Sequence, residues 1–193
     1  MASHESAASS RLLKLELVVA AGLLAVAMGW DAWRQLGLRA ALTTWSLAAV
    51  SLGMIAAVPP LLIILLLELH VDRYMPGLRG LRQSIHLVLA PLVGRMRFAE
   101  ILALSALAGM SEEVFFRGVL QREAGVILTS VIFGLFHAVS LPYVLWAAAV
   151  GGYLGWLAQW HGDLSAPIVA HTMIDIAGLL YIRHVVAPRL ESG

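Results

Sequence analysis

Long apolar runs dominate this chain and limit the folds that it can adopt. Of its 193 residues, 60% are hydrophobic and only 13% are charged, and the mean hydropathy is +0.85. A soluble domain has about 45–50% apolar and about 25% charged residues. Several runs approach the roughly 20 apolar residues that a helix needs to cross a bilayer. The sequence therefore predicts an all-α, polytopic transmembrane helix bundle.

Six segments are candidates for membrane crossings. They are roughly Leu15–Trp30, Ala41–Leu67, Phe98–Leu120, Val126–Leu141, Pro142–Trp160 and Ser165–Ile182. Pro59 and Pro60 predict a kink in the second of them. The segment Ile85–Gly94 is too short to cross and contains Pro91, so we expect it to be re-entrant or to lie at the interface.

The chain divides into four parts on this interpretation. Residues 1–10 are small and polar and predict a disordered tail, and 184–193 form a second short tail. Residues 11–97 hold the N-terminal membrane helices and a basic loop, and 98–183 hold the remaining spans. The first apolar run lacks a small-residue cleavage site, which predicts an uncleaved helix rather than a signal peptide.

Basic residues predict the orientation in the membrane. With the N-terminus inside and six crossings, nine of them fall on the cytoplasmic side and three fall outside, as the positive-inside rule favours. The first group is Arg11, Lys14, Arg73, Arg79, Arg82, Arg95, Arg97, Arg183 and Arg189; the second is Arg34, Arg39 and Arg122.

The remaining composition excludes some classes of function. A net charge of +1 argues against nucleic acid as a partner, and the absence of cysteine excludes disulfides and thiolate chemistry. The partners to expect are the lipid bilayer and a protein or peptide with a membrane-embedded segment.

Ionisable residues inside the last four spans are the main functional signal. A charge at the centre of a membrane helix costs about 2.5–3.5 kcal/mol on insertion scales, so those that persist usually face the protein interior and have partners. The set comprises Glu112, Glu113, Arg117, His137, His171 and Asp175, with Phe133 beside it in the sequence.

Helical spacing predicts which of these side chains meet. Glu113 and Arg117 are four residues apart and can pair on one face. Glu112 is offset from Glu113 by roughly 100°, so it can point toward His137 and His171. A carboxylate in an apolar pocket without a cation beside it is suited to act as a general base.

The same spacing relates two further pairs. Phe133 can pack beside the imidazole of His137, and His171 shares a face with Asp175. Each residue alone has a structural explanation, such as a helix cap for the glutamates, a hydrogen-bonded core histidine or a core phenylalanine. Their joint occurrence, in order, on successive spans favours a shared site.

Three short motifs give the sequence a family resemblance. "EEVFFR" fits EExxxR, "FGLFH" contains FxxxH and "HTMID" fits Hxxx(N/D). In this order on apolar helices, they resemble the CPBP family of intramembrane proteases, also called the Abi or CAAX-protease family, which includes type II CAAX prenyl proteases. The resemblance covers about Phe98–Ile182 and identifies 98–183 as the catalytic core.

The resemblance implies peptide-bond hydrolysis within the membrane. It assigns Glu112 and His137 to the activation of a water, His171 and Asp175 to the oxyanion, and Glu113 and Arg117 to support. Many members have Asn where this chain has Asp175. An ionised aspartate cannot donate to an oxyanion. It can orient His171 instead, or donate if it stays protonated, and we favour the orienting role because a carboxyl beside an imidazole tends to ionise.

A zinc site is the alternative to a metal-free mechanism. Two imidazoles and a carboxylate suffice for catalytic zinc, so Glu112, His137 and His171 would be the ligands and a second glutamate the base. No HExxH motif is present, and the resemblance to prenyl proteases favours a glutamate-activated water with no required cofactor.

Two other functions are compatible with buried Glu and His residues. One is a proton-coupled transporter, because such residues also mark ion paths, although no internal repeat supports it. The other is a non-catalytic scaffold or immunity protein that retains the fold.

The expected substrate is a membrane-anchored or exported protein or peptide, cut near a C-terminal tail or leader. At about 1.5 Å per residue, Glu112, His137 and His171 lie roughly 10–17 Å below the outer surface of the predicted topology. The composition and topology suggest a multi-pass protein of a bacterial inner membrane.

Overall fold

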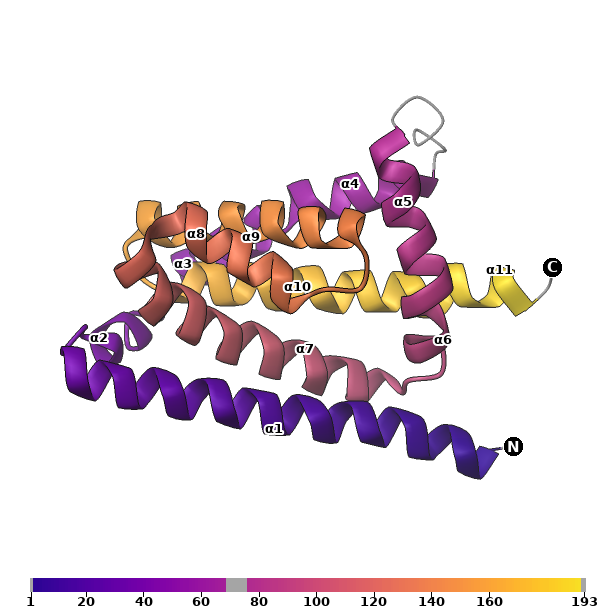
Figure 1. Ribbon diagram of the computed structural model, residues 1–193, viewed down its shortest axis with the longest axis horizontal. Helices are drawn as coiled ribbons and strands as arrows, with labels where there is room; N and C mark the ends of the chain where they lie inside the picture. The colour runs from indigo at the N-terminus through magenta and orange to yellow at the C-terminus, as the bar shows by residue number, and fades with distance from the viewer. Residues whose placement is uncertain (1, 69–75, 192–193) are drawn as a thin grey trace.

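The computed structural model describes residues 2–68 and 76–191, and its regular structure there is entirely helical (Figure 1). The α-helices are α1 (Ala2–Arg34), α2 (Leu38–Leu42), α3 (Leu47–Ala56), α4 (Val58–Glu68), α5 (Pro76–Ser84), α6 (Ala90–Val93), α7 (Phe98–Glu112), α8 (Gln121–Phe136), α9 (Leu141–His161), α10 (Ser165–Tyr181) and α11 (Ala187–Glu191). Among the described residues, three π-helical segments continue them: η2 (Ile85–Leu89), η3 (Glu113–Leu120) and η4 (Ile182–Val186).

Within the described residues, five helical segments are long and apolar enough to cross a membrane. They are Arg11–Arg34, Leu47–Leu66, Phe98–Phe136, Leu141–His161 and Ser165–Leu190. Large apolar side chains point outward along them; Leu47 is 83% exposed and Ile127 is 84% exposed. A soluble protein rarely leaves so many such residues uncovered, whereas lipid covers them here. The predicted all-α, multi-pass class is confirmed.

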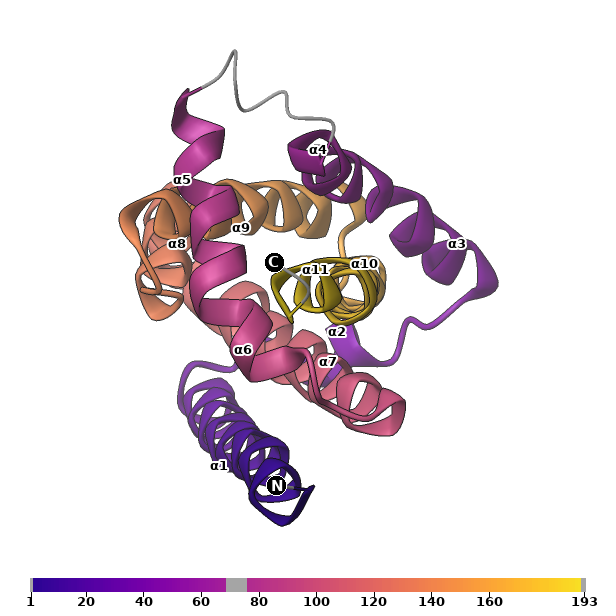
Figure 2. The same cartoon turned by 90° about the vertical axis from the view of Figure 1, so that its right-hand side faces the viewer.

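Helix α10 lies at the centre of the bundle. Figure 2 looks along the bundle and shows α10 and α11 surrounded by α3, α4, α9 and α7, with α1 outside α7. The N-terminus and the C-terminal helix α11 lie at the same end of the molecule (Figure 1). Because α10 touches most of the other long helices, a residue on it can meet residues of several of them.

The third apolar segment folds back on itself at Gly125. This glycine has φ 77° and ψ 167°, a conformation that residues with a Cβ rarely adopt. The two arms then run antiparallel, so that the ring centroid of Phe116 lies 5.0 Å from that of Phe133 and 5.5 Å from that of Phe136. The segment Phe98–Phe136 is thus a helical hairpin, and its arms correspond to the third and fourth predicted spans.

The second arm of this hairpin is shorter than predicted. We expected a span over Val126–Leu141, but the helix ends at Phe136, and His137 leaves the helical conformation with φ −102° and ψ 37°. Residues 126–136 reach only about 16 Å at 1.5 Å per residue, about half of a bilayer core. The reason is local: Ser140 caps the next helix by accepting from the backbone N–H of Tyr143, and Pro142 follows in its first turn.

Other predictions about the N-terminal half are partly confirmed. The helix is interrupted at Ala57, just before Pro59 and Pro60, as expected of residues that lack an N–H. In contrast, α1 begins at Ala2, where a disordered tail was predicted over residues 1–10. No proline or glycine separates the tail from the first span, so the helix continues outward.

The segment from α5 through η2 to α6 runs crosswise to the bundle at the end that holds both termini (Figure 1). This agrees with the expectation that Ile85–Gly94 does not cross. The basic residues divide between the two ends as predicted. In Figure 1, α5 and α11 lie at the termini end, where α1 begins, and α2 lies at the opposite end, where α1 ends. The sequence therefore assigns Arg11, Lys14, Arg79, Arg82, Arg183 and Arg189 to elements at or near the first end, and Arg34 and Arg39 to the second. Arg73, assigned to the first group, lies outside the described residues.

At the opposite end, Asp163 closes the turn between α9 and α10. Its Oδ1 accepts from the backbone N–H and hydroxyl of Ser165 and lies 2.9 Å from Nδ1 of His161. Partial burial alone would raise the pKa of Asp163, but hydrogen bonds from Ser165, Thr44 and His161 outweigh it and hold the pKa below its usual value. The turn therefore fixes the start of α10, on which two of the candidate site residues stand.

Close packing between α3 and α10 depends on Gly53. A Cβ there would lie 2.6 Å from the carbonyl oxygen of Ala166 and from Cβ of Val169. Gly53→Val is therefore expected to reduce the unfolding free energy by about 1–3 kcal/mol through overpacking. The measurement is the thermal midpoint in detergent. Gly22→Val is the matched control, because no atom lies within 4 Å of a Cβ built at Gly22; equal midpoints for the two variants would contradict the packing argument.

Candidate functional site

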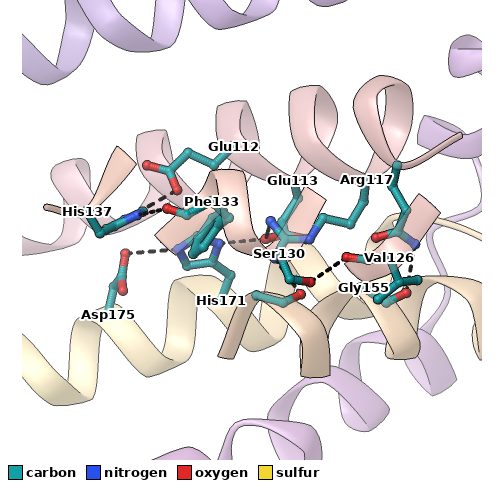
Figure 3. Close-up of polar contacts among 12 residues, drawn as sticks. Glu112, Glu113, Arg117, Val126, Ser130, Phe133, His137, Gly155, His171 and Asp175 are labelled. Atoms are coloured by element: carbon teal, nitrogen blue, oxygen red, sulfur yellow. Dashed lines mark hydrogen bonds and ion pairs between the residues drawn. The ribbon is translucent and has the colours of Figure 1, made fainter. Parts of the chain in front are cut away.

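The structure brings ionisable side chains of three helical segments together in the middle of the bundle. Figure 3 shows them: Glu112 ends α7, Glu113 begins η3, His137 follows α8, and His171 and Asp175 lie on α10. All of these residues were singled out from the sequence. The structure divides these residues into two groups, whereas the sequence predicted a single set.

Glu112 and His137 form the first group. Glu112 Oε2 lies 3.7 Å from Nε2 of His137, and the side chains are 13% and 28% exposed. The other ring nitrogen, Nδ1, lies 2.8 Å from the carbonyl oxygen of Phe133. Since a carbonyl can only accept, Nδ1 carries the proton and donates to it. In the neutral ring, Nε2 therefore presents its lone pair to Glu112.

This arrangement leaves two acceptors facing each other across a short gap. An ionised Glu112 and a neutral His137 have no hydrogen to share, and Glu112 Oε2 is buried with no hydrogen-bond partner among the described residues. A water can donate one hydrogen to each of two acceptors that are 3.7 Å apart. The gap is thus suited to hold and polarise a water.

Glu113, Arg117 and His171 form the second group. Glu113 Oε1 lies 2.9 Å from Arg117 Nη1 and 2.7 Å from His171 Nδ1, and all three side chains are nearly or fully buried. Arg117 also donates from Nη2 to the carbonyl oxygen of Gly151 on α9. The network therefore connects three helical segments and sets the orientation of the His171 ring.

The pairing of the second histidine differs from the prediction. Glu112 was expected to point toward both His137 and His171, but His171 bonds to Glu113 instead. The physical reason is that Glu113 is already held by Arg117 and lies on the face of η3 that meets α10. The predicted pairing of Glu113 with Arg117 is confirmed.

Asp175 and Phe133 complete the arrangement around the two imidazoles. Asp175 Oδ2 lies 3.5 Å from Nε2 of His171, in agreement with the shared face. The ring of Phe133 is 4.5 Å from that of His137 and 5.8 Å from that of His171, and the Arg117 guanidinium lies 4.4 Å over it. Phe133 is thus the apolar wedge that holds both rings, a larger role than the predicted contact with His137.

A π-helix separates the directions of the two glutamates. The segment η3 begins at Glu113, directly after α7 ends at Glu112. Such wide turns are rare and often occur at functional sites. No sequence signal indicates a π-helix, and helical spacing alone predicts an ordinary α-helix here.

Two hollows meet at His137. The first has a volume of about 110 Å³ and extends from His171 and Asp175 past Tyr143 to Ile182. The second has a volume of about 300 Å³ and lies between α1 and the hairpin, where Glu112 and His137 form part of its wall. The first is lined by Ile182, which begins η4, and the second by Leu12 in the N-terminal half of α1. Both therefore extend toward the end of the molecule at which α1 begins and α11 lies (Figure 1).

One ionisable residue at this site was not predicted from the sequence. Glu16 on α1 lines the second hollow together with Glu112 and His137. Its Oε1 is buried and has no hydrogen-bond partner among the described residues. The available signal was a single acid in an apolar first span. The candidate set was limited to the last four spans and therefore did not include Glu16.

The predicted zinc alternative finds no preformed ligand set. Among residues 2–68 and 76–191, no group of three or more His, Cys, Asp or Glu side chains is placed to hold a metal ion. Glu112 and His137 face each other, whereas His171 faces Glu113 through Nδ1 and Asp175 through Nε2. The three proposed ligands therefore do not fit a common ion in this arrangement.

Comparisons with known proteins cover the same part of the chain. Residues 94–177 match the family profile described as "Type II CAAX prenyl endopeptidase Rce1-like". A curated relative, the uncharacterized protein YpbD of Bacillus subtilis (strain 168), is 35% identical over 86 residues, which is 43% of this chain and 46% of YpbD. The chain thus aligns with about half the length of that relative. No solved structure matches.

Proposed function

Because residues 94–177 match the profile of the Rce1-like type II CAAX prenyl endopeptidase family, we propose that this protein is an intramembrane endopeptidase. The observation that carries the proposal is the facing pair of Glu112 and His137, with two acceptors 3.7 Å apart beside a cavity. The matched segment contains this pair, the Glu113 network and Asp175, but not Glu16.

Hydrolysis begins with the water held between Glu112 and His137. Glu112 removes one proton as the water oxygen attacks the carbonyl carbon of the scissile bond, and Nε2 of His137 holds the other hydrogen and aims the oxygen. The tetrahedral intermediate then collapses: the C–N bond breaks, and Glu112 delivers its proton to the leaving nitrogen. The products are a carboxylic acid and an amine, and Glu112 regains its charge.

His171 stabilises the oxyanion of that intermediate. Its Nδ1 is committed to Glu113, so its Nε2 is the atom left for the reaction. In the protonated ring, Nε2–H donates to the oxyanion, and an ionised Asp175 steadies that ring from 3.5 Å. Phe133 keeps the ring of His171 close to that of His137. This assigns Asp175 an orienting role, as its chemistry predicts.

The hollows favour substrates that approach from the basic end. The residue spacing along the predicted spans placed Glu112, His137 and His171 nearer to the outer surface, at the opposite end. Both hollows, however, extend toward the end with the termini. That end carries most of the described Lys and Arg residues, so it is the cytoplasmic one by the positive-inside rule. The second hollow lies beside exposed Phe136, which lets a membrane-anchored segment enter from the lipid.

A deletion strain of the source organism tests the proposed activity. Mass spectrometry of membrane fractions should find membrane-anchored precursors that accumulate unprocessed in the deletion strain and disappear when the wild-type gene is returned. Identical termini of all membrane proteins in the two strains would contradict a proteolytic function. Flux of protons or solutes through reconstituted liposomes, with no cleavage, would indicate the transporter alternative.

Chelation distinguishes the metal-free mechanism from the zinc alternative. Incubation of the purified protein with EDTA or 1,10-phenanthroline is expected to leave the cleavage rate unchanged within about twofold, because Glu112 and His137 need no ion to polarise a water. The check is a cleavage assay in parallel with metal analysis of the protein. Activity that is lost on chelation and restored by Zn²⁺ would overturn the metal-free mechanism.

A further inference from the structure

The second hollow, the crevice between α1 and the hairpin, has a mostly apolar wall that also contains acidic residues. Apolar side chains form most of it, from Leu12, Leu15, Val19 and Leu23 on α1 and from Leu104, Phe116 and Phe136 on the hairpin. Against this background stand Glu16, Glu112 and His137. No lysine or arginine of the described residues lines it, so the acids here lack the cation that Arg117 supplies to Glu113.

Glu16 is not explained by packing or by the fold. Its neighbours Leu17 and Val18 are 48% and 71% exposed and do not line the crevice, whereas Glu16 does. Its Oε1 is buried and without a hydrogen-bond partner among the described residues. A carboxylate at membrane depth is costly and normally has a partner. The described part of the chain supplies no such partner. We therefore expect a bound ligand to supply it.

The chemistry of the crevice specifies that partner. A hollow of about 300 Å³ with apolar walls and a carboxylate suits a long side chain with an apolar stem and a cationic head. Lysine and arginine have this form. Glu112 lines the same hollow, so a cation bound at Glu16 lies within a few residues of the bond that the Glu112–His137 pair would attack.

We propose that Glu16 is a specificity-determining residue that binds a lysine or arginine side chain of the substrate close to the scissile bond. The inference rests on the proposed peptidase function. It names the substrate class as membrane proteins cut near a basic juxtamembrane residue. Helices in the same membrane carry such residues on their cytoplasmic flank, the side toward which this crevice extends.

Synthetic single-span peptides provide the test. Each carries an apolar helix, a scissile flank and Lys, Gln or Glu at one of six successive juxtamembrane positions, and the full-length protein is assayed in liposomes with cleavage mapped by mass spectrometry. At one position, wild-type protein is expected to cleave the Lys peptide with kcat/KM at least about tenfold above the Gln peptide, as a charge-assisted hydrogen bond provides. The Glu peptide should be the poorest substrate.

Variants at residue 16 test whether Glu16 causes the preference for the Lys peptide. In Glu16→Gln the Lys-to-Gln ratio should fall to about one, and in Glu16→Asp, which keeps the charge, most of it should return. Glu123→Gln is the matched control, because this acid is at the opposite end and pairs with Arg34; its ratio should equal that of the wild type. Should Glu16→Gln not fold, Glu16→Met also removes the charge and takes its place, with the same expected ratio of about one.

The outcomes separate the inference from the function on which it rests. No cleavage of any peptide by wild-type protein, or cleavage that persists in Glu112→Gln, rejects the peptidase. Cleavage that depends on Glu112 but shows no preference for Lys, or a preference that survives Glu16→Gln, rejects the role of Glu16 alone. A preference for Glu over Lys rejects it as well, because the crevice would then not act as a cation site.

Discussion

Glu112→Gln is expected to lower the cleavage rate by about 100- to 10,000-fold, the usual contribution of a general base. Glutamine keeps the shape of the side chain but cannot take a proton from a water, and its amide can donate to Nε2 of His137 and so occupy the position of that water. The measurement is kcat/KM on a cleaved membrane peptide or, in cells, the accumulation of unprocessed precursors.

The stability of this variant provides the control. Oε2 of Glu112 has no hydrogen-bond partner among the described residues, so neutralising it should leave the thermal midpoint unchanged or raise it, because no charge then has to be buried. A loss of activity together with a loss of folded protein would point to a structural residue. Wild-type cleavage by well-folded Glu112→Gln protein would contradict the catalytic assignment.

Arg117→Met is expected to lower the unfolding free energy by about 3–5 kcal/mol, the cost of removing one partner of a buried ion pair. The Arg117 side chain is 1% exposed, and its loss leaves the fully buried Glu113 with only His171 and the carbonyl oxygen of Gly151 without its side-chain donor. Methionine fills a similar volume, so the change reports mainly the lost charge. Thermal or denaturant unfolding in detergent measures it.

Two further variants separate this effect from a general loss of charge. Arg34→Met breaks an exposed pair with Glu123, in which the side chains are 47% and 25% exposed, and should cost no more than about 1 kcal/mol. Adding Glu113→Gln to Arg117→Met should recover part of the loss, because the stranded carboxylate is then neutral. If Arg117→Met and Arg34→Met unfold alike, the buried network does not contribute to stability as described.

Features that depend on helix geometry alone could be predicted from the sequence. A spacing of four residues was enough to place Glu113 beside Arg117, Phe133 beside His137 and His171 beside Asp175. The length and apolarity of the spans were enough for the fold class, and Pro59 for the break in the second span. These properties are local, so each can be read from a short window of residues.

Features that depend on packing between helices could not be predicted in this way. Whether His171 meets Glu112 or Glu113 depends on the π-helix after Glu112 and on the angle at which α10 crosses it. The position of Glu16 depends on the docking of α1 against α7, for which its sequence has no marked polar stripe. The half-length helix before His137 depends on the capping of α9 by Ser140, which a hydropathy window averages away.

The turn at Gly125 also has a consequence for biosynthesis. Because Glu112 and His137 stand on the two arms of one hairpin, the ribosome has made both before it makes α10. A nascent chain can therefore assemble the pair that would activate water while the helix bearing His171 is still absent. Under the proposed mechanism, the order of translation would separate the water-activating pair from the oxyanion donor, so the newly inserted chain would stay inactive until its last long helix docks.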